Sequence, residues 1–178
     1  PIKSAKMHCD KHVVKMVIEY AQLLSTAHRM LDGTQYTDAS SGRRIQRWKL
    51  DNSNMDGVLY KASHINHPSA IWVRENAIQY QYMYDLFVEL CDEYTFRYGK
   101  EHLTDTKIRQ LLNQLPNNIT LGVWREPPQC MPDEFKDECS VKAYWNYYIG
   151  EKYTVANKNE KIYEKANMET IRRKYDIY

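Results

Sequence analysis

The chain has 178 residues, 43% hydrophobic and 27% charged, which is ordinary for one globular domain spanning residues 1–178. Its net charge of +2 permits nucleic-acid binding without indicating it, because dedicated binders are usually more basic. The four cysteines form no CxxC pair, which argues against a zinc knuckle and a disulfide framework and predicts a cytoplasmic protein. No apolar run approaches the ~20 residues of a membrane span, so a membrane protein is not expected.

The first predicted element is a helix over about residues 3–31, ended by Asp32 and Gly33. A polar face runs beside its apolar stripe, within an arc of about 100°. This face is either an ordinary solvated surface or a site in which Glu19 acts as acid and base above a phosphate-binding surface. The apolar stripe comprises Cys9, Val13, Met16, Tyr20, Leu23, Ala27 and Leu31, and the polar face comprises His8, His12, Lys15, Glu19, Gln22, Thr26 and Arg29.

Residues 32–61 are polar and irregular, and we interpret them as a long basic loop. Its cations can follow DNA phosphates, and its tryptophan can stack on a base or wedge between bases. The alternative is a solvated loop without a ligand. The residues concerned are Arg43, Arg44, Arg47, Trp48 and Lys49.

A second long helix is predicted from about residue 69 to Tyr98, with Gly99 as its end. Its apolar residues keep a 4-3 spacing, which predicts a seam that crosses the stripe of the first helix. His64, His67 and Arg74 lie at or just inside the start of this helix, where free N–H groups favour anions; capping and packing are the alternative roles. The seam comprises Val73, Ala77, Tyr80, Tyr84, Phe87, Cys91, Tyr94 and Tyr98.

The rest of the chain predicts three short helices, over about residues 105–114, 140–148 and 160–175. A long loop over residues 113–138 contains four prolines, and loops of that length are usually functional or disordered. No segment has the period of a strand. The fold class is therefore all-α: a single compact domain of four or five helices, two of them long and crossing, with long polar loops and no sheet of three or more strands.

Tyrosine is unusually common, with 15 residues against three phenylalanines. Its ring is apolar and its hydroxyl is polar, so the excess indicates either a core built from tyrosine or wet grooves and stacking surfaces. The segment 144–148 is expected to serve both purposes, with one face in the core and the other available for stacking.

Three segments resemble the phage pyrimidine-dimer DNA glycosylase (endonuclease V) family. Asp10-Lys11-His12 followed by Glu19, seven residues after the histidine, is similar to that family's first helix. The stretch from Asn66-His67-Pro68 to Gly99 looks like its second helix, and residues 144–150 resemble its aromatic C-terminal segment. The first of these segments, from His8 to Met16, is also similar to phage and cyanophage proteins. The three segments occur in the family's order and cover about half of the chain.

The resemblance implies a DNA glycosylase with AP-lyase activity that binds double-stranded DNA and needs no cofactor. In that family the N-terminal amine attacks the deoxyribose C1′, so Glu19 would be the acid and base here, with His12 beside it. Pro1 is a secondary amine that can form an iminium, provided that it is the natural terminus. It lies closer to the histidine than the family's threonine does, and if other residues precede it, Pro1 is merely a proline in the first turn of a helix.

Two other functions stay open. His8 and His12 have the i, i+4 spacing of a metal-binding pair, as in a metal-dependent phosphohydrolase. Asp10 points to another face of the helix, however, and we assign no metal ligand. The chain could also be a non-enzymatic DNA-binding or virion-associated phage protein that has kept the fold without the chemistry.

Overall fold

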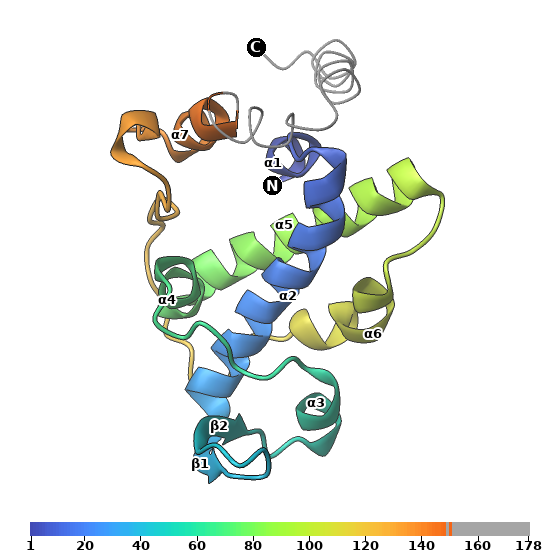
Figure 1. Ribbon diagram of the computed structural model, residues 1–178, viewed down its shortest axis with the longest axis vertical. Coiled ribbons are helices and arrows are strands. Elements are labelled where there is room, and N and C mark those ends of the chain that lie inside the picture. Colours follow the sequence, from blue (N-terminus) through green and yellow to red (C-terminus); the bar gives the residue numbers. More distant parts are fainter. Residues whose placement is uncertain (149, 151–178) are drawn as a thin grey trace.

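Two long helices cross at the centre of the protein (Figure 1). They are α2, Asp10–Asp32, and α5, Ala77–Tyr98, in a computed structural model that describes residues 1–148 and 150. They pack through apolar faces that coincide only in part with the predicted stripes, because the face that removes the most apolar area from water is the one that is buried. In the first helix Val13, Tyr20 and Ala27 are buried as predicted, whereas Met16, Leu23 and Leu31 are half-buried. The buried side chains include Val13, Val17, Ala21 and Leu24 of α2 and Tyr80, Phe87, Leu90 and Cys91 of α5.

Shorter elements surround this pair. They are α1, Ile2–Lys6; α3, Ser53–Val58; α4, Pro68–Glu75; α6, Leu103–Leu112; the 3-10 turn η1, Asp133–Phe135; and α7, Ser140–Tyr147. The mostly helical class is confirmed, with about 58% of the described residues helical. The protein is not strictly all-α, however, since the described part of the chain contains seven α-helices and one two-stranded sheet. The predicted helix over 160–175 lies outside the described residues.

None of the helices in residues 1–148 has the length and apolarity that crossing a membrane requires.

The first predicted helix is broken at residues 7–9, between α1 and α2. The prediction of one continuous helix is therefore wrong, and Arg97 of α5 supplies the physical reason. Its guanidinium donates to the carbonyl oxygens of Lys6 and His8, which are released by the break, and to the Asp10 carboxylate at 2.9 Å. The break turns His8 into the interior, where its side chain is 9% exposed.

The second predicted helix is also divided, at Asn76. The Asn76 side chain caps α5 by accepting hydrogen bonds from the backbone N–H groups of Ile78 and Gln79. The proline-rich loop docks at the same place, because Ala77 N–H donates to the Thr120 carbonyl at 2.9 Å. The cap and the docked loop together offer the backbone a better set of partners than a continuous helix would.

The predicted basic loop contains a β-hairpin, which is the two-stranded sheet by which the protein departs from the all-α class. Strand β1, Thr34–Asp38, pairs antiparallel with β2, Ile45–Lys49, and Gly42 adopts the left-handed backbone (φ 76°) that the connecting turn requires. Gly33 connects α2 to the hairpin, and a Cβ there would lie 2.4 Å from the Arg29 carbonyl oxygen and 3.0 Å from the Trp48 Cβ. Only glycine permits this close approach of strand and helix.

Candidate functional site

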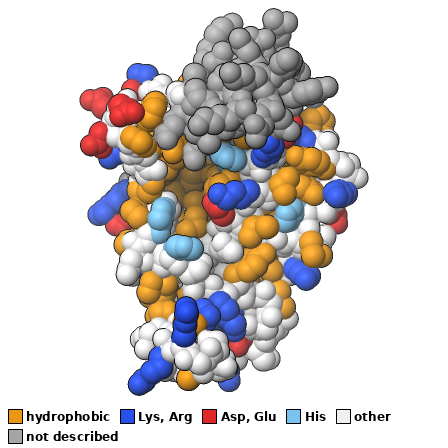
Figure 2. Space-filling model, viewed as in Figure 1, with side chains coloured by type: hydrophobic (Ala, Val, Ile, Leu, Met, Phe, Trp, Pro, Cys, Tyr) orange, Lys and Arg blue, Asp and Glu red, His pale blue; other side chains and the backbone are white. Residues whose placement is uncertain are grey.

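A cavity of about 560 Å³ lies between the N-terminal half of α2, the start of α4, α5, the proline-rich loop and α7. This size is usual for ligand pockets in proteins. Figure 2 shows apolar side chains in the hollow and histidine side chains beside it. The aromatic part of the wall comprises Tyr20, Trp72, Tyr82, Tyr144, Trp145 and Tyr148.

Glu19 lines this cavity, as its position on the helical wheel predicts for a site residue. It is the only carboxylate among the described lining residues. Its Oε1 lies 2.9 Å from Lys15 Nζ, one turn earlier on α2, and the two side chains are 40% and 66% exposed. A pair so accessible contributes little to stability, so the carboxylate remains open to a ligand in the cavity.

His8 belongs to the wall of the cavity as well, at the break between α1 and α2. Its Nδ1 lies 2.8 Å from the Ser4 carbonyl oxygen and its Nε2 lies 2.9 Å from the Tyr20 hydroxyl. Burial lowers the pKa of His8 to about 4, so the ring is neutral at pH 7. With both nitrogens engaged inside the protein, His8 neither contacts phosphate nor shares a metal with His12, contrary to those two hypotheses.

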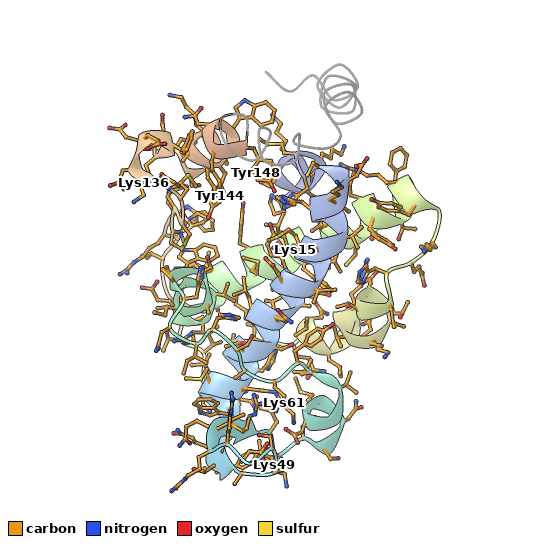
Figure 3. The ribbon with its side chains drawn as sticks, in the orientation of Figure 1. Lys15, Lys49, Lys61, Lys136, Tyr144 and Tyr148 are labelled. Carbon is orange, nitrogen blue, oxygen red and sulfur yellow. The ribbon has the colours of Figure 1, made fainter. Side chains whose placement is uncertain are left out.

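His12 and Tyr148 meet at the top of the cavity. The His12 Nδ1 is hydrogen-bonded to the Tyr148 hydroxyl, and the rings contact edge to face with centroids 5.2 Å apart. Figure 3 shows Tyr144 and Tyr148 between α7 and the N-terminal half of α2, which carries Lys15. His12 therefore acts on the cavity through Tyr148, which it holds in place, and is not itself part of the wall.

His64 and His67 lie at the exposed edge of the cavity, before and at the start of α4. His64 has a left-handed backbone (φ 47°), uncommon for a residue with a side chain and often found at binding sites. His67 accepts a hydrogen bond from Ser69 N–H through Nδ1, so the neutral ring carries its hydrogen on Nε2. The predicted capping role of His67 is thus confirmed, and the ring keeps a donor for a ligand.

The basic hairpin lies at the other end of the molecule from α7 (Figure 1). Lysine and arginine side chains gather there on the face that also carries the hollow (Figure 2). Arg43, Arg44 and Lys49 are exposed, whereas Arg47 and Trp48 are half-buried. Lys61, which the sequence pattern did not single out, lies at the same end of the molecule as Lys49 (Figure 3). The pKa of Asp38 on β1 is lowered by hydrogen bonds from Ser40 and, to a smaller extent, by the charges of Arg47 and Lys61.

Arg29 does not belong to any exposed face, so its predicted contact with DNA is wrong. The side chain is fully buried and all five of its N–H groups donate within the protein. The acceptors are the carbonyl oxygens of Trp48, Asp56, Leu59 and Tyr60 and the Asp56 carboxylate, at 2.6 to 2.9 Å. This network fastens the hairpin and α3 to the end of α2.

Two further predicted residues lie away from the cavity wall. Arg74 is half-buried in the last turn of α4, and burial lowers its pKa. Its Nη1 is buried and has no hydrogen-bond partner among the residues that the structure describes. Pro1 is exposed before α1, although Ser4 and Met7 of the same segment line the cavity.

Sequence reasoning missed Trp72 and Tyr82, whose rings contact edge to face in the cavity wall. The tyrosine excess was the available signal. It indicated either a core or a stacking surface, and the structure uses tyrosine for both purposes: Tyr80 is a core residue, whereas Tyr82 and Tyr144 are partly exposed to the cavity.

Comparison with protein-family models, with curated proteins and with solved structures found no match for this chain. Within residues 1–148 and 150, no group of three or more His, Cys, Asp or Glu side chains is arranged to hold a metal ion.

Proposed function

We propose that this protein acts on damaged or modified bases in double-stranded DNA, as a glycosylase with a linked AP-lyase step, and that Glu19 is its acid and base. One observation carries the proposal: Glu19 is the single carboxylate among the described residues around an aromatic cavity that is large enough for a base. An enzyme that acts on a base must take it out of the DNA stack, and tyrosine and tryptophan rings replace the lost stacking.

The lyase step needs an amine and a base. The amine attacks C1′ of the deoxyribose, water leaves and an iminium forms; a carboxylate then removes a C2′ proton and the 3′ phosphate departs. Glu19 suits the proton transfer because its carboxylate is accessible in the cavity wall, where it forms an ion pair with Lys15 at 2.9 Å. The resemblance assigns the amine to the N-terminal end of the chain, and α1 brings this segment to the cavity, where Ser4 lies in the wall.

The charge on this face supports the same function. His64 and His67 stand at the edge of the cavity, where a phosphate next to an extruded base would pass. The hairpin cations lie on the same face at a distance along α2. Contacts to phosphates supply most of the affinity of a protein for duplex DNA, and they fix where the protein sits on it.

The first experiment measures cleavage of a duplex oligonucleotide with one abasic site, with borohydride trapping of the iminium. Glu19→Gln keeps the size and polarity of the side chain but cannot accept the proton. We expect cleavage to fall by at least two orders of magnitude, which is the usual contribution of a general acid or base, while DNA binding persists. Glu101→Gln is the matched control, because Glu101 is exposed in the connection between α5 and α6, away from the cavity. This variant should cleave like the parent.

Two results would contradict the proposal. Glu19→Gln cleaving like the parent would exclude Glu19 as the acid and base. A parent protein that binds duplex DNA but neither cleaves nor traps on abasic, damaged or modified DNA would favour the non-enzymatic DNA-binding or virion-associated protein.

A further inference from the structure

The polar atoms in the wall of the cavity determine which ligands it accepts. Most of the wall is aromatic or aliphatic. Its polar side chains include possible donors, such as Gln22 and His67, and a set of oxygen atoms on Tyr20, Tyr144 and Glu19. All three residues line the same cavity. A hydroxyl can donate or accept a hydrogen bond, and which of these it offers to a ligand depends on where its hydrogen already points.

The hydrogen of the Tyr20 hydroxyl points to His8. Because the Ser4 carbonyl oxygen can only accept, the hydrogen of the neutral His8 ring must be on Nδ1, 2.8 Å away. His8 Nε2 then has a lone pair, and the Tyr20 hydroxyl donates to it at 2.9 Å. The pKa of His8, about 4, keeps this arrangement at neutral pH. Tyr20 can therefore only accept a hydrogen bond from a ligand.

Tyr144 is restricted in the same way by a different partner. Its hydroxyl donates to the Pro128 carbonyl oxygen at 2.9 Å, which leaves only lone pairs for the cavity. The carboxylate of Glu19 is an acceptor as well. The wall thus carries three acceptor groups, from α2 and α7, and the two tyrosine hydroxyls are held by hydrogen bonds within the protein.

From this pattern we infer that the ligand presents hydrogen-bond donors to the wall, and that the preferred base carries an exocyclic amino group, as adenine and cytosine do. The inference rests on the proposed function, since it takes a base as the occupant. An amino group gives its hydrogens to the tyrosine and glutamate oxygens. An oxo group at the same position would face lone pairs, so it would lose its hydration without gaining a partner.

The test uses free nucleosides in two matched pairs that differ by amino against oxo: 2′-deoxyadenosine with 2′-deoxyinosine, and 2′-deoxycytidine with 2′-deoxyuridine. Titration calorimetry on the full chain gives four dissociation constants. We expect each amino nucleoside to bind about tenfold more tightly than its oxo partner, the usual effect of one unpaired buried polar group. Tyr20→Phe and Tyr144→Phe should each bring this ratio close to one. Tyr84→Phe is the matched control, because that hydroxyl also donates to a carbonyl oxygen, of Arg109, outside the cavity.

Tyr20→Phe leaves His8 Nε2 without its donor and can unfold the protein. Tyr144→Phe leaves the His8 contacts intact, so the affinity ratio is measured with this variant if Tyr20→Phe does not fold. Equal affinities within both pairs, or a ratio that neither variant changes, would overturn the inference. The absence of nucleoside binding would overturn it as well. Tighter binding of tetramethylammonium than of any nucleoside would also overturn it, because the site would then be an aromatic cage for cations. Cleavage at an abasic site needs no base in the cavity, so the proposed function and this inference fail in different experiments.

Discussion

Arg29 holds three separate segments together through one side chain. Its planar guanidinium can address several acceptors at once, which the single ammonium of lysine cannot. The acceptors come from β2, α3 and the segment after α3, none of which has a large apolar core of its own. The position of the hairpin relative to α2 therefore depends on this residue.

Replacement of Arg29 by Met should lower the free energy of unfolding by about 3–5 kcal/mol, because the carbonyl oxygens and the Asp56 carboxylate lose their donors in a mostly buried place. Denaturant unfolding followed by circular dichroism measures the change. Arg44→Met removes an exposed arginine from the hairpin and should change stability by no more than about 0.5 kcal/mol. Similar stabilities for the two variants would contradict the structural role of Arg29.

At the scale of the elements, apolar periodicity predicted both long helices and their crossing, because that pattern depends only on neighbours along one helix. The first break depends on Arg97, a partner far away in sequence that no local pattern encodes. The second combines a distant partner, Thr120, with a local signal, the Asn76 cap, which the periodicity did not include. The hairpin was missed because β1 has four exposed residues out of five, so it lacks the apolar alternation by which strands are recognised.

The same limit applies to the candidate site. Glu19 lies on a regular part of α2, where the helical wheel applies, and it lines the cavity. The wheel placed His8 and Arg29 on an exposed face, yet both are buried: His8 by the break and Arg29 by the hairpin that folds over the helix end. Periodicity states which side chains share a face, and it does not state what covers that face.

The hairpin gives a prediction about salt. If its arginines neutralise phosphates, the logarithm of the DNA affinity should fall with the logarithm of the salt concentration by about 0.9 for each contact. Replacing Arg43, Arg44 and Arg47 by Ala should reduce this slope by up to about 2.7. Fluorescence anisotropy with a labelled duplex over a range of salt measures it, and Lys136→Ala, beside η1, is the control. An unchanged slope in the triple variant would remove the hairpin from the DNA-binding surface.

For the molecule as a whole, buried histidines make stability depend on pH, and His8 and His28 are the two with the largest lowering of the pKa. Desolvation lowers the pKa values of His8 and His28 to about 4 in the folded protein, from an ordinary 6.5. Between these values the unfolded chain takes up protons that the folded chain does not, so folding becomes less favourable as the pH falls. Above pH 6.5 both states are neutral and the effect is absent.

The free energy of unfolding should therefore decrease by up to roughly 1.4 kcal/mol for each histidine and each pH unit between pH 6.5 and 4. Denaturant unfolding at pH 7 and at pH 5 measures this decrease, and His28→Gln should make it smaller by removing one of the two groups. Equal stability of the parent at pH 7 and pH 5 would show that neither ring is held neutral by its surroundings.

The length of α2, 23 residues, has a consequence for how much DNA the protein would cover. From Glu19 in the cavity wall to Asp32 before the hairpin, α2 rises by roughly 20 Å. Successive base pairs of a duplex are about 3.4 Å apart, so the same length corresponds to about six of them. A protein that holds a base in the cavity and phosphates on the hairpin would protect the duplex asymmetrically, over about six base pairs on one side of the target base. The distance that α2 spans between cavity and hairpin would set this number.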